Sequence, residues 1–262
     1  MIDTHCHILP KYGYTDLSEI INNAKNAGIN KMICIGCQFE DFDETFEATE
    51  KYPNIIYCAI GLHPENIKED SNINKMFEDF KRIVLNNKDK IFAIGECGLD
   101  YHFSDNKHIH KMQQELFLKH LELCIELQKP IIIHTRDVWE DTFRLLDEIS
   151  FKTHLQDTHI IKDQGNSFPN MDISLTSGIV HSFTGNITQA QECIKRGFKV
   201  GINGIVTFKK SADIREAVKY IGLNNIVLET DSPFLTPEPY RGKVNEPAHI
   251  KEIAYFITDL VK

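Results

Sequence analysis

The sequence lacks three features that would place the protein in a membrane, in a secretory pathway or on a nucleic-acid surface. No stretch of its 262 residues approaches eighteen consecutive apolar residues, so no membrane span is expected. The early apolar run is interrupted by Asp3, His5 and His7, so no secretory signal is expected. Positive charge is scarce: 29 Lys and Arg oppose 38 Asp and Glu, a formal net charge of −9. A broad basic surface that coats nucleic acid is therefore excluded, and a phosphate-bearing substrate must be held locally.

A disulfide framework is also missing. The seven cysteines are odd in number and scattered, which argues against a disulfide framework and for a reducing compartment. Cys34 and Cys37 have the spacing of a redox or zinc pair, but they lie in an apolar run with no second pair nearby. We expect a cytoplasmic protein, or a nuclear one if its source is eukaryotic. Nothing in the sequence indicates an obligate protein partner.

Short β-like runs alternate with amphipathic helical stretches along the chain. The predicted strands are 1–8, 31–36, 55–62, 91–95, 130–135, 178–182, 199–201 and 225–229, and helical spacing marks 16–27, 74–86, 108–128, 139–149, 187–196, 212–221 and 246–261. Eight strands with intervening helices predict an α/β fold, a (β/α)8 TIM barrel that forms one domain over residues 1–262. The competing doubly wound sheet would need a glycine-rich turn after the first strand, where two histidines stand instead.

One connection departs from this regular order. Residues 151–177 are polar and long for a link between a helix and a strand, so they are predicted to be a surface insertion. His154 and His159 fall inside it and are interpreted as exposed loop residues. His102, His108, His110, His120 and His249 are interpreted as surface or helix residues.

Polar residues recur where the predicted strands end, the edge at which barrel enzymes build their active sites. These residues are His5, His7, His63, Glu96, His134, His181 and Asp231. A His-X-His pair on one strand places both imidazoles on the same face, so that one cation can meet both. Alone the pair is weak evidence, but imidazoles and carboxylates from six strands converge on one barrel mouth. The sequence thus predicts a metal-dependent hydrolase.

The number of candidate ligands exceeds the three that one open catalytic zinc usually takes. Two metals explain the number better, because Glu96 can bridge a site at His5 and His7 and a site at His134 and His181. Two such ions lower the pKa of a bound water and stabilise charge at a phosphoryl or acyl centre. Asp231 can complete the first site and accept a proton from that water.

Six segments together resemble the TatD family of metal-dependent deoxyribonucleases. They are 3–7 (DTHCH), 61–64 (GLHP), 95–101 (GECGLDY), 134–137 (HTRD), 181–185 (HSFTG) and 229–233 (ETDSP), in an order that covers nearly the whole chain. The resemblance implies an amidohydrolase-like TIM barrel with two divalent ions, Mg²⁺, Mn²⁺ or Zn²⁺. It also implies cleavage of DNA phosphodiesters, with single-stranded DNA cut from an end.

The resemblance also assigns roles to individual residues. It makes His5 and His7 ligands of one metal, Glu96 the bridging ligand, His134 and His181 ligands of the second metal, and Asp231 a ligand and general base. Glu96 and Asp231 are thus the catalytic carboxylates. His63 is assigned to the substrate phosphate or to support of a ligand. Arg136 could contact phosphate or form a structural salt bridge, and both readings stay open.

For further residues near these motifs the sequence leaves more than one role open. Glu229 either supports a metal-binding histidine or has a buried structural role. Cys97 replaces a commoner aliphatic residue and is expected to face away from Glu96. Tyr101, Phe183 and Phe208 could stack on a nucleobase, although core packing is expected for at least two of them. The segment 240–243 (YRGK) could steer phosphate or simply be a solvated loop.

Two other functions compete with a nuclease. The first is a metal-dependent amidohydrolase or esterase that acts on a small molecule or an acylated nucleic acid. A carbamylated lysine that bridges the metals would favour the small-molecule enzymes. Glu96 stands at the end of the fourth strand instead, which favours a nuclease without excluding other esters. The second is a catalytically silent scaffold, whose mark would be a missing metal residue, and none is missing.

Overall fold

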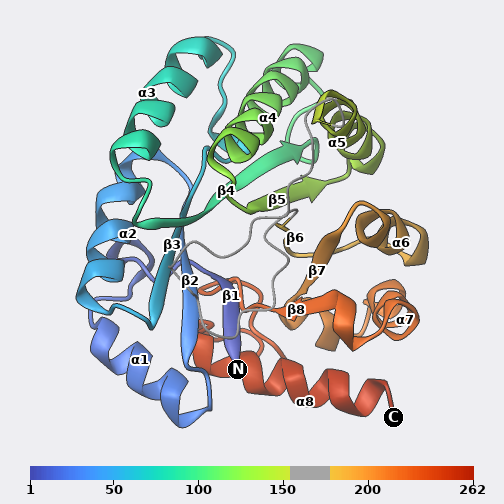
Figure 1. The fold of residues 1–262 in the computed structure, drawn as a ribbon. Helices are drawn as coiled ribbons and strands as arrows, with labels where there is room; N and C mark the ends of the chain where they lie inside the picture. Colours follow the sequence, from blue (N-terminus) through green and yellow to red (C-terminus); the bar gives the residue numbers. More distant parts are fainter. Residues whose placement is uncertain (154–177) are drawn as a thin grey trace.

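The computed structural model describes residues 1–153 and 178–262, and in this part of the chain eight parallel strands stand in sequence order inside a ring of helices (Figure 1). The strands are β1 (Ile2–Cys6), β2 (Lys31–Gly36), β3 (Ile56–Ile60), β4 (Ile91–Asp100), β5 (Ile131–Arg136), β6 (Gly178–Val180), β7 (Phe198–Ile202) and β8 (Ile226–Leu228). The predicted (β/α)8 barrel is confirmed.

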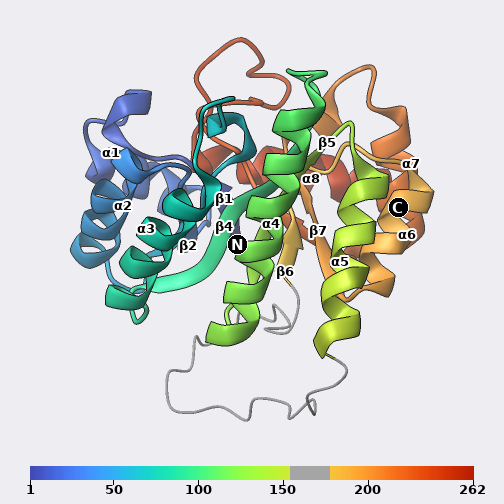
Figure 2. The same ribbon diagram turned by 90° about the horizontal axis from the view of Figure 1, so that it is seen from above.

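Helices follow the strands and cover the outside of the barrel, as the two views show (Figures 1 and 2). They are α1 (Leu17–Asn26), α2 (Phe39–Lys51), α3 (Ile73–Asn86), α4 (Lys107–Leu127), α5 (Trp139–Thr153), α6 (Ile187–Lys195), α7 (Ala212–Ile221) and α8 (Ile250–Leu260). Short 3₁₀ turns lie at Pro10–Tyr12, Pro64–Asn66, Gly204–Thr207, Leu223–Asn225 and Pro247–His249. Helix α2 was not among the helical stretches predicted from the sequence.

Side-chain caps fix where several helices begin. The Asp16 carboxylate accepts hydrogen bonds from two backbone N–H groups at the start of α1, and Asn106 caps α4 in the same way. Asn186 and Gln189 form a reciprocal capping box at α6. Helix α5 continues to Thr153, so the first three residues of the predicted insertion belong to it. The rest of that insertion, with His154 and His159, lies outside the described residues.

The barrel closes between β1 and the segment that follows β8. The backbone N–H of Asp231 donates to the His5 carbonyl at 2.9 Å, and that of His7 donates to the Ser232 carbonyl at 2.8 Å. Thr4 adds a side-chain hydrogen bond to the Leu228 carbonyl. This pairing brings the first and last sequence motifs side by side, although more than two hundred residues separate them.

Apolar side chains from several strands fill the barrel interior. They form one buried cluster of Ile33, Ile35, Tyr57, Ala59, Phe92, Ala93, Ile132 and Ile179. Side chains alternate along a strand, so a residue two positions further on points to the same face. His134 follows Ile132 at this spacing, and His181 follows Ile179. The polar residues of the mouth therefore rest on an apolar floor.

Strand β4 is longer than predicted, and this corrects the sequence reading of Glu96. The sequence placed the end of the strand at Gly95, whereas β4 runs to Asp100. Its register against β5 shifts between Ile94 and Cys97. Ile94 and Cys97 both pack in the cluster outside the barrel, and Glu96 between them faces the mouth. Glu96 thus lies in the middle of β4 and not after its end. Because side chains alternate along the strand, Asp100 also faces the mouth.

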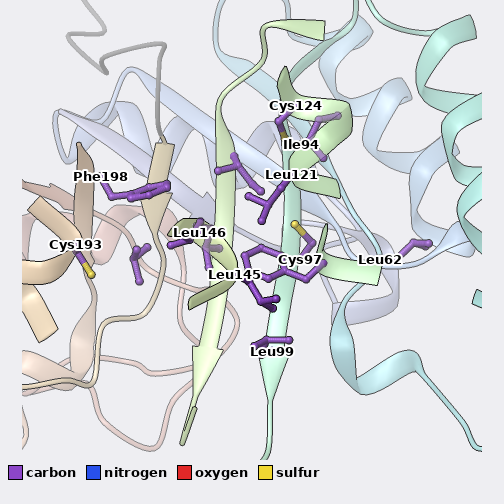
Figure 3. Close-up of a cluster of buried hydrophobic side chains, with 14 of the residues drawn as sticks. Leu62, Ile94, Cys97, Leu99, Leu121, Cys124, Leu145, Leu146, Cys193 and Phe198 are labelled. Carbon is purple, nitrogen blue, oxygen red and sulfur yellow. The ribbon is translucent and has the colours of Figure 1, made fainter. Parts of the chain in front are cut away.

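Cys97 packs away from the mouth, as expected. It is fully buried in the apolar layer between the barrel and the helices, in the same cluster as Leu121 and Cys124 of α4 (Figure 3). Burial raises the pKa of its thiol well above the usual range. All seven cysteines lie in the described part of the chain and are unpaired. Among the described helices, none has the length and apolar character needed to cross a bilayer.

Candidate metal centre

The six residues predicted as metal ligands lie together at the mouth of the barrel. His5 Nε2 is 3.2 Å from His7 Nε2 and 3.3 Å from Glu96 Oε2. Asp231 Oδ1 lies 3.3 Å from His7 Nε2 and 3.8 Å from His5 Nε2. All four side chains are largely or wholly buried, and Asp231, at 13%, has the most exposed side chain of the four.

The two carboxylate oxygens of Glu96 face different histidines. Oε2 faces the pair of His5 and His7, with 4.0 Å separating it from His7 Nε2. Oε1 lies 2.8 Å from His134 Nδ1 and 3.6 Å from His181 Nε2. The carboxylate therefore stands between the two halves of the predicted centre.

The two central carboxylates are negatively charged at neutral pH. Burial opposes the charge on Glu96, but the neighbouring His181, His63 and His5 hold its pKa well below the usual range. Burial likewise opposes ionisation of Asp231, but the adjacent His7 and the charges of the nearby His181 and His5 lower its pKa. The mouth thus holds two ionised carboxylates, which favour positively charged neighbours.

The four candidate ligand histidines each turn one ring nitrogen inward. The outer nitrogen meets a partner in three of them: His7 Nδ1 faces the Ile35 carbonyl at 3.3 Å, His134 Nε2 faces Asp100 Oδ2 at 2.9 Å, and His181 Nδ1 faces Glu229 Oε1 at 3.1 Å. Acceptors at these positions favour a proton on the outer nitrogen. The inner nitrogen then presents its lone pair, the arrangement typical of metal-binding histidines.

Glu229 and Asp100 are the acidic partners of this arrangement. Glu229 fits because β7 carries glycine opposite it: a Cβ atom at Gly201 would lie 2.3 Å from Glu229 Oε2. The sequence suggested this role for Glu229 and gave none to Asp100. The signal for Asp100 was present, since Glu96, Gly98 and Asp100 alternate along one strand, but it required β4 to continue past Gly95.

His63 also reaches the centre, but it presents a hydrogen-bond donor there. Its Nε2 lies 3.5 Å from Glu96 Oε1, whereas its Nδ1 accepts a hydrogen bond from the Glu65 backbone N–H at 3.2 Å. A neutral imidazole that accepts at Nδ1 carries its proton on Nε2. His63 therefore presents a hydrogen-bond donor to the mouth, in contrast to His7, His134 and His181, whose outer nitrogens face acceptors.

His5, His134 and His181 have shifted pKa values. Burial and the adjacent His181 lower the pKa of His5 to about 4. Burial also opposes charge on His134 and His181, but the carboxylates outweigh it and raise their pKa values to about 9 and about 10. Protons on these rings balance the carboxylates in the metal-free protein, so metal binding must displace them.

The donor set fits divalent cations. A four-coordinate ion with ligand bonds of about 2.1 Å has neighbouring ligand atoms about 3.4 Å apart. The measured separations among His5, His7, Glu96 and Asp231 are 3.2 to 4.0 Å. Three groups of ligand atoms in the described residues are close enough to hold an ion: His5, His7 and Glu96; His5, His181 and Glu229; and His63, Glu96 and His134.

The centre opens into a cavity of about 610 Å³. Arg136 lines this cavity, and its guanidinium lies 4.8 Å from the centre of the Phe103 ring. Two further aromatic residues, Tyr12 and Phe234, line the cavity beside His7. Sequence reasoning identified none of these three aromatic residues.

The aromatic residues that the sequence suggested for base stacking are occupied elsewhere. Phe183 is buried in the core, and Tyr101 stacks on His110 while its hydroxyl donates to Asp141. Arg241 covers the ring of Phe208 at 4.1 Å. That contact joins the 240–243 segment to the loop after β7, and whether the segment steers phosphate stays a prediction.

Comparison with known proteins identifies the family of the chain. The family model of TatD-related DNases matches residues 2–262. The chain belongs to this family. It is 36% identical to a *Bacillus subtilis* protein described as an uncharacterized metal-dependent hydrolase, over 99% of this chain and 91% of the relative. It is 30% identical to a 3′–5′ ssDNA/RNA exonuclease of *Salmonella typhimurium*, over 97% of this chain and 88% of the relative.

A solved structure shows the same fold. The TatD homologue YjjV of *Escherichia coli* superimposes with a TM-score of 0.82 at 26% identity, over 99% of this chain and 90% of that one. Membership of the family makes the protein a metal-dependent hydrolase, with candidate metal-binding clusters of histidine and carboxylate side chains at the barrel mouth.

Proposed function

We propose that the protein hydrolyses phosphodiester bonds of single-stranded DNA, removes nucleotides from an end, and uses two divalent ions held by the six ligand residues. The observation that carries the proposal is the position of Glu96, whose two oxygens face separate pairs of histidines. The *Salmonella* relative that acts as a 3′–5′ ssDNA/RNA exonuclease supports the same chemistry.

In this proposal His5, His7, Glu96 and Asp231 hold one ion, and Glu96, His134 and His181 hold the other. Bound ions of this kind, Mg²⁺, Mn²⁺ or Zn²⁺, supply an acidified water and neutralise charge at the phosphoryl group. The outer partners Asp100 and Glu229 fix the ring orientation and tautomer of His134 and His181.

Asp231 acts as the general base. Its lowered pKa leaves it ionised at neutral pH, and it lines the cavity with part of its side chain exposed. It therefore can take a proton from the attacking water. His63 donates its Nε2 proton in a hydrogen bond to a phosphate oxygen. Arg136, which lines the same cavity, offers a second donor to the phosphate.

The test uses the purified protein with 5′-labelled and 3′-labelled single-stranded oligonucleotides and a panel of Mg²⁺, Mn²⁺ and Zn²⁺. We expect only the oligonucleotide labelled at the end opposite to the attacked end to shorten step by step, and we expect no product in EDTA. Asp231→Asn should lose about 10²- to 10⁴-fold in kcat. The isosteric Asp259→Asn, at an exposed position of α8, is the matched control and should retain full activity.

Three results would contradict the proposal: cleavage that persists in EDTA, full activity in Asp231→Asn, or hydrolysis of carboxylic esters or amides with no cleavage of DNA. The last result would favour the amidohydrolase or esterase alternative.

A further inference from the structure

Large aromatic side chains are exposed at the mouth on two different loops. Phe103, after β4, is 66% exposed, and Phe234, after β8, is 48% exposed. Both line the cavity that contains the metal centre. An exposed phenylalanine presents apolar surface to water, and here that surface borders the reacting groups.

Each ring is held in place by its neighbours. Phe234 makes edge contacts with Tyr12 at 5.7 Å and His7 at 6.2 Å, and its backbone N–H donates to the Asp231 carbonyl at 2.8 Å. Its ring is therefore fixed relative to the metal centre, and about half of it remains open.

Phe103 is held by the preceding residue, His102, and by Arg136 at the end of the neighbouring strand β5. The Arg136 guanidinium lies 4.8 Å from its ring centre, and the His102 ring contacts it edge-on at 4.9 Å. His102 is itself paired with Asp137 at 2.8 Å. Two-thirds of Phe103 remains available for contact, beside a cation suited to phosphate.

The barrel topology places these rings on opposite sides of the centre. The strands stand in the order β1 to β8, and β1 closes against the segment after β8. In a ring of eight, β4 and β8 are diametrically opposed. Glu96 of β4 and Asp231 after β8 therefore lie between Phe103 and Phe234.

We infer that Phe103 and Phe234 form two separate nucleobase-binding walls, and that the nucleosides on either side of the cleaved phosphodiester bind one to each wall. The inference rests on the proposed function and adds the geometry of its substrate. Aromatic faces stack on bases of any sequence. Adjacent bases in a stacked strand are about 3.4 Å apart, too close to reach opposite walls of one cavity. The bound dinucleotide is therefore splayed, and a base-paired strand cannot bind in this way.

The test combines single variants with substrates that lack one base. Phe103→Leu and Phe234→Leu remove the aromatic face and keep apolar bulk, and Tyr255→Leu on α8, also 66% exposed, is the matched control. The substrates are an intact single-stranded oligonucleotide and two versions with a tetrahydrofuran abasic residue on one or the other side of the terminal scissile phosphate.

We expect each Phe→Leu variant to raise KM for the intact oligonucleotide about 10-fold, with a smaller effect on kcat, while Tyr255→Leu changes neither. The Phe103→Leu penalty should disappear with one abasic substrate and the Phe234→Leu penalty with the other. Phe→Trp at each position should restore KM. Penalties that persist with both abasic substrates, or that disappear with the same one, would overturn the inference.

A binding measurement separates this inference from the proposed function. Oligonucleotides with 2-aminopurine at either flanking position are titrated into the cleavage-deficient Asp231→Asn protein with Mg²⁺. Stacking on each wall should quench the fluorescence, and the matching Phe→Leu change should abolish the quench. Absence of cleavage by the unaltered enzyme would reject the proposed function. Cleavage with unchanged KM in both Phe→Leu variants and no quench would reject the two walls alone.

Discussion

Buried histidines occur at the barrel mouth and in the layer between the barrel and α4, and the two regions hold them in opposite ways. His120 of α4 donates from Nδ1 to the Leu116 carbonyl at 2.8 Å and accepts at Nε2 from the Leu62 backbone N–H at 3.2 Å. Both ring nitrogens are used by the backbone, so the ring is neutral. Burial lowers its pKa to about 4.

At the mouth, His134 and His181 instead have one ring nitrogen next to a carboxylate, Asp100 or Glu229. Their second nitrogen lies next to Glu96, which is an acceptor, and among the described residues no backbone donor is found at that nitrogen. The difference shows that burial alone does not identify a metal ligand. What distinguishes a candidate ligand is an inner nitrogen directed at the atoms of other candidate ligands, where a metal ion can replace a proton. His63, which accepts a backbone hydrogen bond like His120 yet faces Glu96, lies between the two classes.

The largest expected effect comes from neutralising the shared carboxylate. Glu96→Gln keeps the shape of the side chain but removes the charge that both histidine pairs face, so activity should fall on the order of 10³-fold. Initial rates with a labelled oligonucleotide check this. His120→Gln is the contrasting variant and should keep most of the activity, and equal losses in the two variants would remove the distinction between the two regions.

Metal removal should lower the free energy of unfolding of the protein, and this response should depend on the mouth histidines but not on His120. A ligand at one hundred times its Kd stabilises the folded state by about 2.7 kcal/mol, so EDTA should lower the free energy of unfolding by about that amount. Urea titrations with and without Mn²⁺ measure it. His5→Ala should lose this metal response, whereas His120→Gln should keep it. A metal response that survives in His5→Ala would place the ion elsewhere.

The carboxylates behind the ligands should have an intermediate effect. Asp100→Asn or Glu229→Gln weakens the orientation of His134 or His181, and metal affinity should fall about 10- to 100-fold. Isothermal titration with Mn²⁺ checks this, with Asp137→Asn as a control that pairs with exposed His102. Unchanged affinity in both variants would show that these carboxylates serve the fold alone.

The smallest effect concerns the pH dependence of stability at His120. Its folded pKa of about 4 lies below the 6.5 of an unfolded histidine, so its contribution is complete above pH 6.5 and is lost as the pH falls toward 4. Between pH 7 and pH 5.5 this amounts to about 1.2 kcal/mol. Urea unfolding of the metal-free protein at the two pH values measures this difference in the free energy of unfolding. The difference should be smaller by that amount in His120→Gln than in the unaltered protein. If the free energy of unfolding of His120→Gln changed with pH as much as that of the unaltered protein, the conclusion that the His120 ring is neutral would be contradicted.

Sequence patterns were sufficient for the barrel and for the positions of the six candidate ligands. Strand and helix periodicity is local, and His5, His7, His134 and His181 stand where such patterns end or alternate. Helix α2 was missed, although Phe39, Phe42 and Phe46 recur at helical spacing among its six acidic residues. Whether residues 151–177 form a surface insertion stays a prediction, since most of them lie outside the described residues.

Other features depended on contacts between distant segments. The stacking candidates Tyr101, Phe183 and Phe208 carry the right chemistry, but neighbours from other elements cover them. Phe103 and Phe234 look like ordinary loop residues until the barrel places them across one cavity. The partnership of Asp100 with His134 depends on the register of β4 against β5, which shifts between Ile94 and Cys97.

The sequence by itself determined the succession of βα units, the chemical identity of the candidate ligands and the family, because these follow from residue type and spacing. The tertiary structure decided which nitrogen of each histidine faces inward, which oxygen of Glu96 faces which pair, and which aromatic faces stay open. Those properties depend on hydrogen-bond partners and packing neighbours contributed by strands far apart in the chain, and local spacing carries no information about them.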